Sequence, residues 1–450
     1  MRRFDPVPTR AVITGIGVVT PLGSSAASFW EALRTGRSGV KTMTTAHANS
    51  FSAHFGALLE GFDAKNFLDK KDRKRLAVMS RPFQIAVAAS RLALADAGLT
   101  LGQLDPTRVG SVLGAGVIPN EPLEFARGGR CSTVALGRVD LGRWGQEGMS
   151  LVPPMWMLSY IPNMVGCHVS VLNNAQGPSN TITQTDLAGL LALGEAWRYL
   201  RRQQADVVLV GGADTRASVM SWIRQQLMHP LSQRNDAPEK ACRPFDRDRD
   251  GLVLGDGGGI LVVESYEHAR RRGARMYAEL TGFGAAFDKS ANRGVGHWRT
   301  GAPSGRRTPY PVRPGRQHGL AHAIRLALRQ AGITPADLDH VNAHGCSTVP
   351  DDLWEAQGLA EALGPNAVPV FATKSRFGTL GVGAGPVELA ASLLALRHGE
   401  LPATLNCEHP DPACAVHVAT MSQPIRKSHF LKVSFTELGQ CAAVVCRRVD

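Results

Sequence analysis

Residues 177–189 read Gly-Pro-Ser-Asn-Thr-Ile-Thr-Gln-Thr-Asp-Leu-Ala-Gly and contain the first side chain that could do chemistry, Asp186. The pattern predicts a buried strand, a tight turn and then a helix over residues 187–203. This geometry carries one side chain, that of Asp186, to the N-terminus of the helix. A helix N-terminus stabilises a carboxylate as an anion, so we expect Asp186 to be a poor nucleophile for covalent catalysis.

Three further polar side chains follow in the second half of the chain. His344 lies in Val-Asn-Ala-His-Gly-Cys-Ser-Thr, Lys374 in Thr-Lys-Ser and Glu388 in Gly-Pro-Val-Glu. Each motif is weak by itself, because a single His at the end of a strand is more often structural than reactive. An imidazole and a carboxylate in one pocket are typical of general acid–base chemistry. Taken together, in this order and after the turn of Asp186, the three motifs indicate one class of protein far more specifically than each does alone.

The elements that must position these residues follow the same order in both halves of the chain. Strands are predicted over residues 10–19, 109–117, 205–214, 277–284, 338–344, 368–373, 430–435 and 442–447, and a further strand ends at residue 264. Helices are predicted over residues 25–35, 187–203, 319–332, 351–363 and 385–397, with a helical tract over 70–98. The repetition predicts an internally duplicated, five-layered α/β/α/β/α fold, with halves at residues 1–265 and 266–450.

Three segments stand outside this pattern. Residues 125–144 are rich in Gly and Arg and are expected to be irregular. Residues 149–164 are unusually apolar, which is typical of core or of a subunit interface. The basic run at residues 70–75 is interpreted as a solvated helix face rather than a binding site.

Composition limits the class of protein. With 450 residues, 44% of them hydrophobic and 20% charged, the chain is typical of a soluble enzyme of two or three domains. The formal charge of +12 would suit an acidic partner, an anionic surface or nucleic acid, but no nucleic-acid motif accompanies it. The eight cysteines show no metal-binding spacing, and no signal peptide or membrane-length apolar run is visible. We therefore expect a cytoplasmic protein with reduced thiols, no metal and no membrane span.

Together these stretches resemble the elongating β-ketoacyl-acyl-carrier-protein synthases of the thiolase superfamily. The resemblance covers nearly the whole chain and includes the opening Val-Ile-Thr-Gly-Ile-Gly-Val-Val-Thr-Pro-Leu-Gly, the Gly-Pro-Ser turn, the run at 243–251 and the motif of His344. It implies a cysteine that takes an acyl chain from the phosphopantetheine arm of acyl carrier protein. It also implies two histidines that assist decarboxylation of the malonyl extender, and no bound cofactor.

Matched to that family, the reactive positions are largely replaced. The cysteine position is Asp186, the first histidine is retained as His344, and the second histidine position is Thr379. The resemblance makes Glu437 the residue at the gate position, and it places Cys346 and Thr348 where two threonines hold the pantetheine arm. It gives supporting roles in the loop network to Lys374, Glu388 and Asp256.

The resemblance therefore predicts a subunit of the chain-length-factor type, which lacks its own nucleophile and forms a heterodimer with a cysteine-bearing ketosynthase. Such subunits commonly replace the cysteine by Gln, so Asp186 departs from the usual form. Homodimers are possible when the partner is absent. Two alternatives stay open: an acyl-processing enzyme that uses Asp186 with His344 as an acid–base pair, and a scaffold that binds carrier protein without processing its cargo.

Two surfaces follow from this interpretation. The strand at residues 180–185 and the apolar segment at 149–164 are expected to form the dimer interface. Residues 292–317 contain Arg293, His297 and five further arginines and are expected to form an exposed insertion. That insertion is either a solvated loop, which is slightly favoured, or a docking surface for an acidic carrier protein or subunit.

Overall fold

A computed structural model of the chain describes residues 9–44, 50–100, 102–118, 122–134, 137–216, 218–288 and 318–449. Within these ranges, eleven strands form one mixed sheet in the order β12-β10-β9-β14-β15-β8-β1-β7-β6-β4-β5. The first half of the chain supplies β1 (Ala11–Val19), β4 (Val109–Ala115), β5 (Ser179–Thr183), β6 (Val207–Asp214) and β7 (Gly257–Ser265). The second half supplies β8 (Ala278–Phe287), β9 (Leu338–Asn342), β10 (Pro369–Phe371), β12 (His417–Val418), β14 (His429–Phe435) and β15 (Gln440–Arg447).

The strand order reveals the duplication. Each half has five main strands if the two-residue strand β12 is left out. When these five are numbered along the chain, both halves have the order 3-2-4-5-1. In both, strands 2, 3 and 4 are parallel and strand 5 is antiparallel to its two neighbours. The halves meet where Ala11, Val12 and Ile13 of β1 pair with β8. The predicted internal duplication is therefore confirmed, whereas the exact division at residue 265 stays a prediction.

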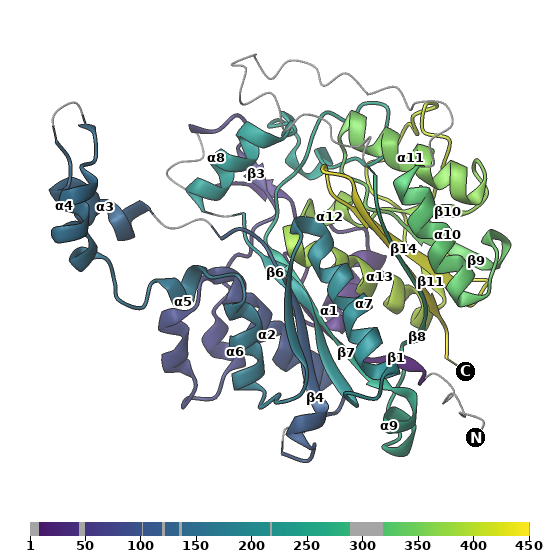
Figure 1. Cartoon of the computed structure of the whole chain (residues 1–450). Helices are drawn as coiled ribbons and strands as arrows, with labels where there is room; N and C mark the ends of the chain where they lie inside the picture. Colours follow the sequence, from purple (N-terminus) through teal and green to yellow (C-terminus); the bar gives the residue numbers. More distant parts are fainter. Residues whose placement is uncertain are drawn as a thin grey trace.

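Helices fill the layer between the two half-sheets and cover both outer faces (Figure 1). The central helices contact strands and each other, and the outer helices pack on the far sides of the half-sheets. The central layer holds α7 (Ala188–Arg201) and α13 (Ala384–His398), and the outer layers hold α2 (Arg81–Asp96), α6 (Met164–Leu172), α10 (Gly319–Ala331) and α11 (Val349–Leu363). The five-layered thiolase-like fold expected from the sequence is confirmed.

Local sequence explains the two central helices. Both are rich in Ala and Leu, and every side chain from Ala384 to Leu396 is buried. α13 ends at Gly399, whose φ of 73° is the left-handed conformation that glycine adopts without strain. On α7, a Cβ at Gly189 would lie 2.6 Å from Cδ of Pro386. Glycine at this position lets the two central helices approach each other closely.

The remaining elements are short. They are α1 (Ala26–Arg34), β2 (Lys41–Thr42), β3 (Phe55–Gly56), α3 (Pro122–Cys131), α4 (Leu141–Gln146), α5 (Met157–Tyr160), α8 (Val219–Met228), α9 (Tyr266–Arg271), α12 (Lys374–Phe377), β11 (Glu400–Leu401) and β13 (Gln423–Pro424). The tract at 70–80 contains a 3₁₀ helix, Arg73–Val78, and the regular helix α2 begins only at Arg81.

The expectation that the strand before Asp186 is buried is wrong. Among the described strands, β5 pairs only with β4 at the edge of the sheet, and Ser179, Asn180 and Thr183 are exposed. The β-branched residues of this stretch favour a strand, but Ile182 is the one apolar side chain in it. The order strand, turn and helix is as predicted, whereas the burial is not.

The expectation that residues 125–144 are irregular is also wrong. They contain most of α3 and the first four residues of α4, which is capped by Asp140, whose side chain accepts a hydrogen bond from Arg143 N. The two helices project from the body of the molecule (Figure 1). We call residues 122–134 and 137–156 the arm. Seven large apolar side chains of the arm are exposed: Leu123, Val134, Val139, Leu141, Met149, Leu151 and Met155.

We predict that Gly189→Ala destabilises the protein, because the added methyl group would overlap Pro386. Overpacking of this kind costs about 1–3 kcal/mol in the free energy of unfolding. Urea denaturation measures the change. The control is Gly129→Ala on α3, where a Cβ would meet no atom within 4 Å. Equal effects of the two substitutions would contradict close packing between α7 and α13.

Candidate active site

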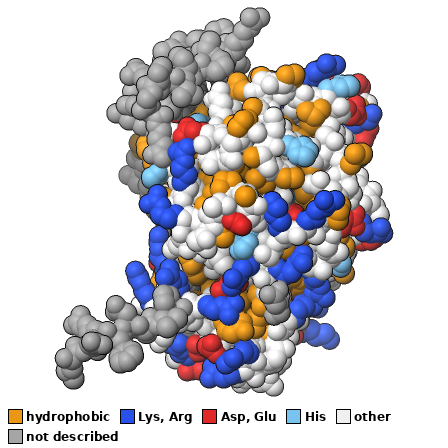
Figure 2. Space-filling model, turned by 90° about the vertical axis from the view of Figure 1, so that its right-hand side faces the viewer, with side chains coloured by type: hydrophobic (Ala, Val, Ile, Leu, Met, Phe, Trp, Pro, Cys, Tyr) orange, Lys and Arg blue, Asp and Glu red, His pale blue; other side chains and the backbone are white. Residues whose placement is uncertain are grey.

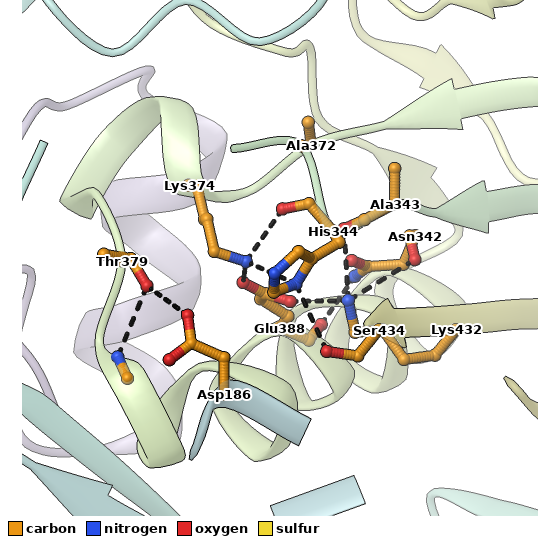
Figure 3. A network of polar contacts seen from close by, with 12 residues as sticks. Asp186, Asn342, Ala343, His344, Ala372, Lys374, Thr379, Glu388, Lys432 and Ser434 are labelled. Atoms are coloured by element: carbon orange, nitrogen blue, oxygen red, sulfur yellow. Dashed lines mark hydrogen bonds and ion pairs between the residues drawn. The ribbon is translucent and has the colours of Figure 1, made fainter. Parts of the chain in front are cut away.

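Asp186 lies in a 3₁₀ turn, Thr185–Leu187, that joins β5 to α7. Thr185 has a φ of 44°, a left-handed conformation that costs free energy for a β-branched residue. Both carboxylate oxygens of Asp186 have partners. Thr379 Oγ1 donates to Oδ2 at 2.8 Å, as Figure 3 shows, and Arg216 Nη2 lies 3.4 Å from Oδ1. The side chain at the tip of the turn is therefore fixed by a hydroxyl group and a cation.

Arg216 and Asp214 belong to this site although the sequence analysis did not select them. Asp214 is the last residue of β6 and Arg216 follows the strand, and Arg216 Nη2 lies 3.2 Å from Asp214 Oδ2. Burial raises the pKa of Asp214, while the charge of Arg216 acts to lower it. The available signal was positional: β6 ends in Asp214, and parallel strands bring their C-terminal ends to the same edge of a sheet.

His344 follows β9, and side chains of α12 and β14 hold it in place. Lys374 Nζ donates to His344 Nδ1 at 2.9 Å and to the His344 carbonyl oxygen at 2.7 Å, and Ser434 Oγ lies 3.2 Å from Nδ1 (Figure 3). Burial, followed by the charges of Lys374 and Lys432, lowers the pKa of His344 well below its usual value. Because an ammonium group can only donate, Nδ1 is the acceptor and the proton is assigned to Nε2. His344 is therefore a neutral hydrogen-bond donor.

Glu388 on α13 binds two lysines at once. Oε1 accepts from Lys374 Nζ and Oε2 from Lys432 Nζ, each at 2.5 Å. Burial acts to lower the pKa of Lys374, but the charge of Glu388 opposes it and the net pKa is raised. Lys432 on β14 also donates to the carbonyl oxygen of Ala343 at 3.1 Å. The sequence analysis missed Lys432, although a lysine amid an apolar strand such as Phe-Leu-Lys-Val-Ser-Phe is a signal.

The other predicted residues are distributed around this network. Cys346 is buried, and burial and then the charge of Asp351 raise the pKa of its thiol well above the usual value. Thr348 caps α11, because its hydroxyl accepts from Asp351 N. Asp256 is buried behind Arg216 and accepts from its backbone N at 2.6 Å.

Several of these side chains line one cavity of about 60 Å³. Asp186, Arg216, His344, Cys346, Thr379 and Glu437 are among its lining residues. It is much smaller than typical ligand pockets, which span roughly 300–1,000 Å³. Among the described residues, no hydrogen bond joins Asp186 to His344, although both side chains line this cavity. Lys374 and Glu388 do not line the cavity. They influence it by holding His344 in place.

Two kinds of feature are absent from the described ranges, a metal-binding cluster and a membrane-spanning helix. These ranges contain no group of three His, Cys, Asp or Glu side chains with the arrangement of a metal site. They also contain no helix with the length and apolar character that crossing a membrane requires. The predicted docking loop at residues 292–317 lies outside the described residues.

Comparison with known proteins places this site in a family. The fold is of the thiolase-like α/β class, and residues 9–269 and 303–408 match the models of the β-ketoacyl synthase N-terminal and C-terminal domains. The 3-oxoacyl-[acyl-carrier-protein] synthase 2 of Vibrio cholerae is 34% identical over 417 residues, which is 91% of this chain and 92% of that protein. The chain belongs to the β-ketoacyl synthase family.

Solved structures agree in architecture. A β-ketoacyl synthase from Burkholderia phymatum superimposes with a TM-score of 0.82 at 30% identity, covering 98% of this chain and 100% of the other. The ishigamide ketosynthase/chain length factor gives a TM-score of 0.81 at 26% identity, covering 99% of this chain and 100% of the other. The chain is thus similar both to a ketosynthase and to a ketosynthase/chain length factor.

The charge state of His344 makes a pH-dependent prediction. The unfolded chain takes up a proton on this imidazole below about pH 6.5, whereas the folded site, with its lowered pKa, does not. This group therefore makes the folded protein lose stability as pH falls below about 6.5, by up to about 1.4 kcal/mol per pH unit. In His344→Asn, the amide oxygen replaces Nδ1 as an acceptor for Lys374, and that loss should be absent.

The measurement is urea denaturation of wild type and His344→Asn between pH 8 and pH 5. The stability advantage of the wild type should shrink as the pH falls. His409→Asn, at an exposed position, controls for the loss of an imidazole as such. An advantage of the wild type that is constant across this range would contradict a neutral, protected His344.

Proposed function

We propose that this chain is a ketosynthase-like subunit without a nucleophile, and that it serves as the chain-length-factor-type partner of an active ketosynthase in fatty acid or polyketide biosynthesis. The observation that carries the proposal is Asp186 at the tip of the turn, with one oxygen on Thr379 and the other facing Arg216. A carboxylate held in this way does not form the thioester on which the family's acyl transfer depends. Loss of a nucleophile typically lowers rates by about 10⁴–10⁶.

The malonyl half-reaction is affected as well. Thr379 occupies the second histidine position, and its hydroxyl hydrogen is donated to Asp186. It therefore cannot also donate to charge that develops on a substrate oxygen. Removing one such donor costs about 2.7–4 kcal/mol in transition-state stabilisation. His344 remains a neutral donor, but it acts alone.

The surface supports pairing with a second subunit. β5 offers one unpaired strand edge, which can join antiparallel to another copy across a two-fold axis. The projecting arm exposes seven large apolar side chains, and burying apolar surface contributes about 25 cal/mol per Å². The similar ishigamide structure is titled a ketosynthase/chain length factor. A cysteine-bearing ketosynthase is therefore the partner that we propose, with a homodimer as the form adopted without it.

Acyl carrier protein is the second proposed partner, with its phosphopantetheine arm as the carrier of the substrate. One similar solved structure is titled a type II polyketide synthase acyl-carrier protein in complex with its ketosynthase. The chain has a formal charge of +12, and Lys and Arg gather over the lower part of the face in Figure 2, with fewer acidic side chains among them. A basic surface attracts an acidic carrier protein, and salt weakens this attraction.

We predict that the purified chain neither becomes acylated nor releases carbon dioxide from malonyl-carrier protein. Intact-protein mass spectrometry with acyl-carrier protein measures acylation, and labelled malonyl-carrier protein measures decarboxylation. An active ketosynthase of the family is the positive control, and His344→Ala gives the background. A stable acyl adduct on this chain, or carbon dioxide release above that background, would refute the proposal.

We predict that the chain is dimeric by light scattering, and that co-expression with its cysteine-bearing partner gives a heterodimer. Trp156 of the arm packs edge-to-face on Phe125, with ring centroids 5.3 Å apart. Trp156→Ala should loosen the arm, weaken the heterodimer and change the product length. Met421→Ala, at a side chain 77% exposed outside the arm, is the control. A monomer in both preparations would exclude the interface, and an unchanged product length would exclude a role in setting it.

A further inference from the structure

Arg216 is a buried cation at the centre of a group of carboxylates. The residue is 7% exposed, and its Nη2 lies 3.4 Å from Asp186 Oδ1 and 3.2 Å from Asp214 Oδ2. Its Nε is buried without a hydrogen-bond partner in the described part of the chain. The charge of this guanidinium is therefore balanced by ion pairs with two aspartates rather than by water.

The backbone around Arg216 is shaped to hold it there. Asp256 Oδ1 accepts from Arg216 N at 2.6 Å, which fixes the start of the side chain. On the other side, Gly381 has a φ of 54°, and a Cβ there would lie 2.5 Å from Arg216 Nη2. A larger residue at Gly381 would occupy the space that the guanidinium needs. Two independent features thus fix the position of the charge.

The two aspartates do not have equivalent surroundings. Asp214 also accepts from the backbone N of Thr215 at 2.8 Å and of Val382 at 3.4 Å. Asp186 has no described backbone donor, and Thr379 and Arg216 are the described partners of its side chain. Its orientation therefore depends on these two side chains more than that of Asp214 does. Together they turn the carboxylate toward Arg216 and Thr379 instead of toward His344.

We propose that Arg216 is a positioning residue, the built-in counter-ion for whatever group stands at position 186. In the native chain it turns the Asp186 carboxylate toward itself and away from His344. The inference extends the proposed function. It rests on that function because it takes the residue at position 186 to be non-nucleophilic. Its tests measure stability and the ionisation of an introduced thiol, not acyl transfer, so their failure is distinguishable from failure of the acylation experiment.

The first test is a double-mutant cycle of Asp186→Asn and Arg216→Met, followed by urea denaturation at pH 7.5. Each single variant leaves a buried charge with one partner fewer, whereas the double variant removes both charges of the pair. We expect the double variant to be more stable than the sum of the singles predicts, by at least about tenfold in the folding equilibrium constant. Arg224→Met with Asp186→Asn is the control, because Arg224 lines the cavity without an ion pair to Asp186. Additive effects in the Arg216 cycle would overturn the proposal.

The second test applies if a single variant fails to fold. Asp186→Cys introduces a thiol beside Arg216, and a neighbouring cation lowers a thiol pKa below about 8.5. The rate of iodoacetamide alkylation against pH, read by mass spectrometry on the peptide of the turn, gives that pKa. Adding Arg216→Met should raise it by at least about one unit, and adding Arg224→Met should leave it nearly unchanged. The same thiol pKa with and without Arg216, or an equal rise with Arg224→Met, would overturn the proposal.

Discussion

The site depends on one interaction, in which the carboxylate of Glu388 binds two buried lysines. It lies on the central helix α13 and binds Lys374 of α12 and Lys432 of β14. A buried charge is strongly unfavourable unless it is paired, so three elements must keep their positions together. Lys374 then fixes Nδ1 of His344, and Lys432 binds the carbonyl group of Ala343 just before it. The geometry around His344 therefore follows from one carboxylate below it.

This arrangement separates the part of the site that maintains structure from the part that would react. Among the described residues, no hydrogen bond or ion pair joins the network of Glu388, Lys374, Lys432 and His344 to Asp186, whose charge contributes only a minor part of the raised pKa of Lys374. The group of Asp186, Thr379, Arg216 and Asp214 lies on the opposite side of the cavity and has its own charge balance. The carboxylate of Asp186 thus has a compensating cation nearby, and the support of His344 does not depend on it.

Much of the fold was predictable because periodicity and turn residues report secondary structure directly. The two repeated series of strands and helices predicted the duplication, and the Gly-Pro-Ser turn predicted the place of Asp186. Burial of β5 was not predictable from its Thr-rich sequence, because strand propensity does not distinguish an edge strand from a central one. The helices of the arm were missed because Gly and Arg in residues 125–144 obscured the helical pattern.

The candidate site was predicted less completely, for a different reason. The resemblance selected the positions at which it implies reactive groups, namely Asp186, His344 and Thr379. Arg216 and Lys432 carry charges that matter only through partners distant in sequence, namely Asp186 and Glu388. Such pairs become visible when the carboxyl ends of strands are considered together, or when a charged residue interrupts an apolar strand.

The burial of α13 also bears on how the two halves of the fold depend on each other. Because every side chain from Ala384 to Leu396 is buried, this helix has no face suited to water. The matching helix of the first half, α7, lies against it, and the two half-sheets share one strand order. Either half by itself would expose its central helix to water, so a half-fold of this kind needs a second one to cover it. The two halves therefore depend on each other for burial, and they divide the site between them, the first carrying the turn of Asp186 and the second His344.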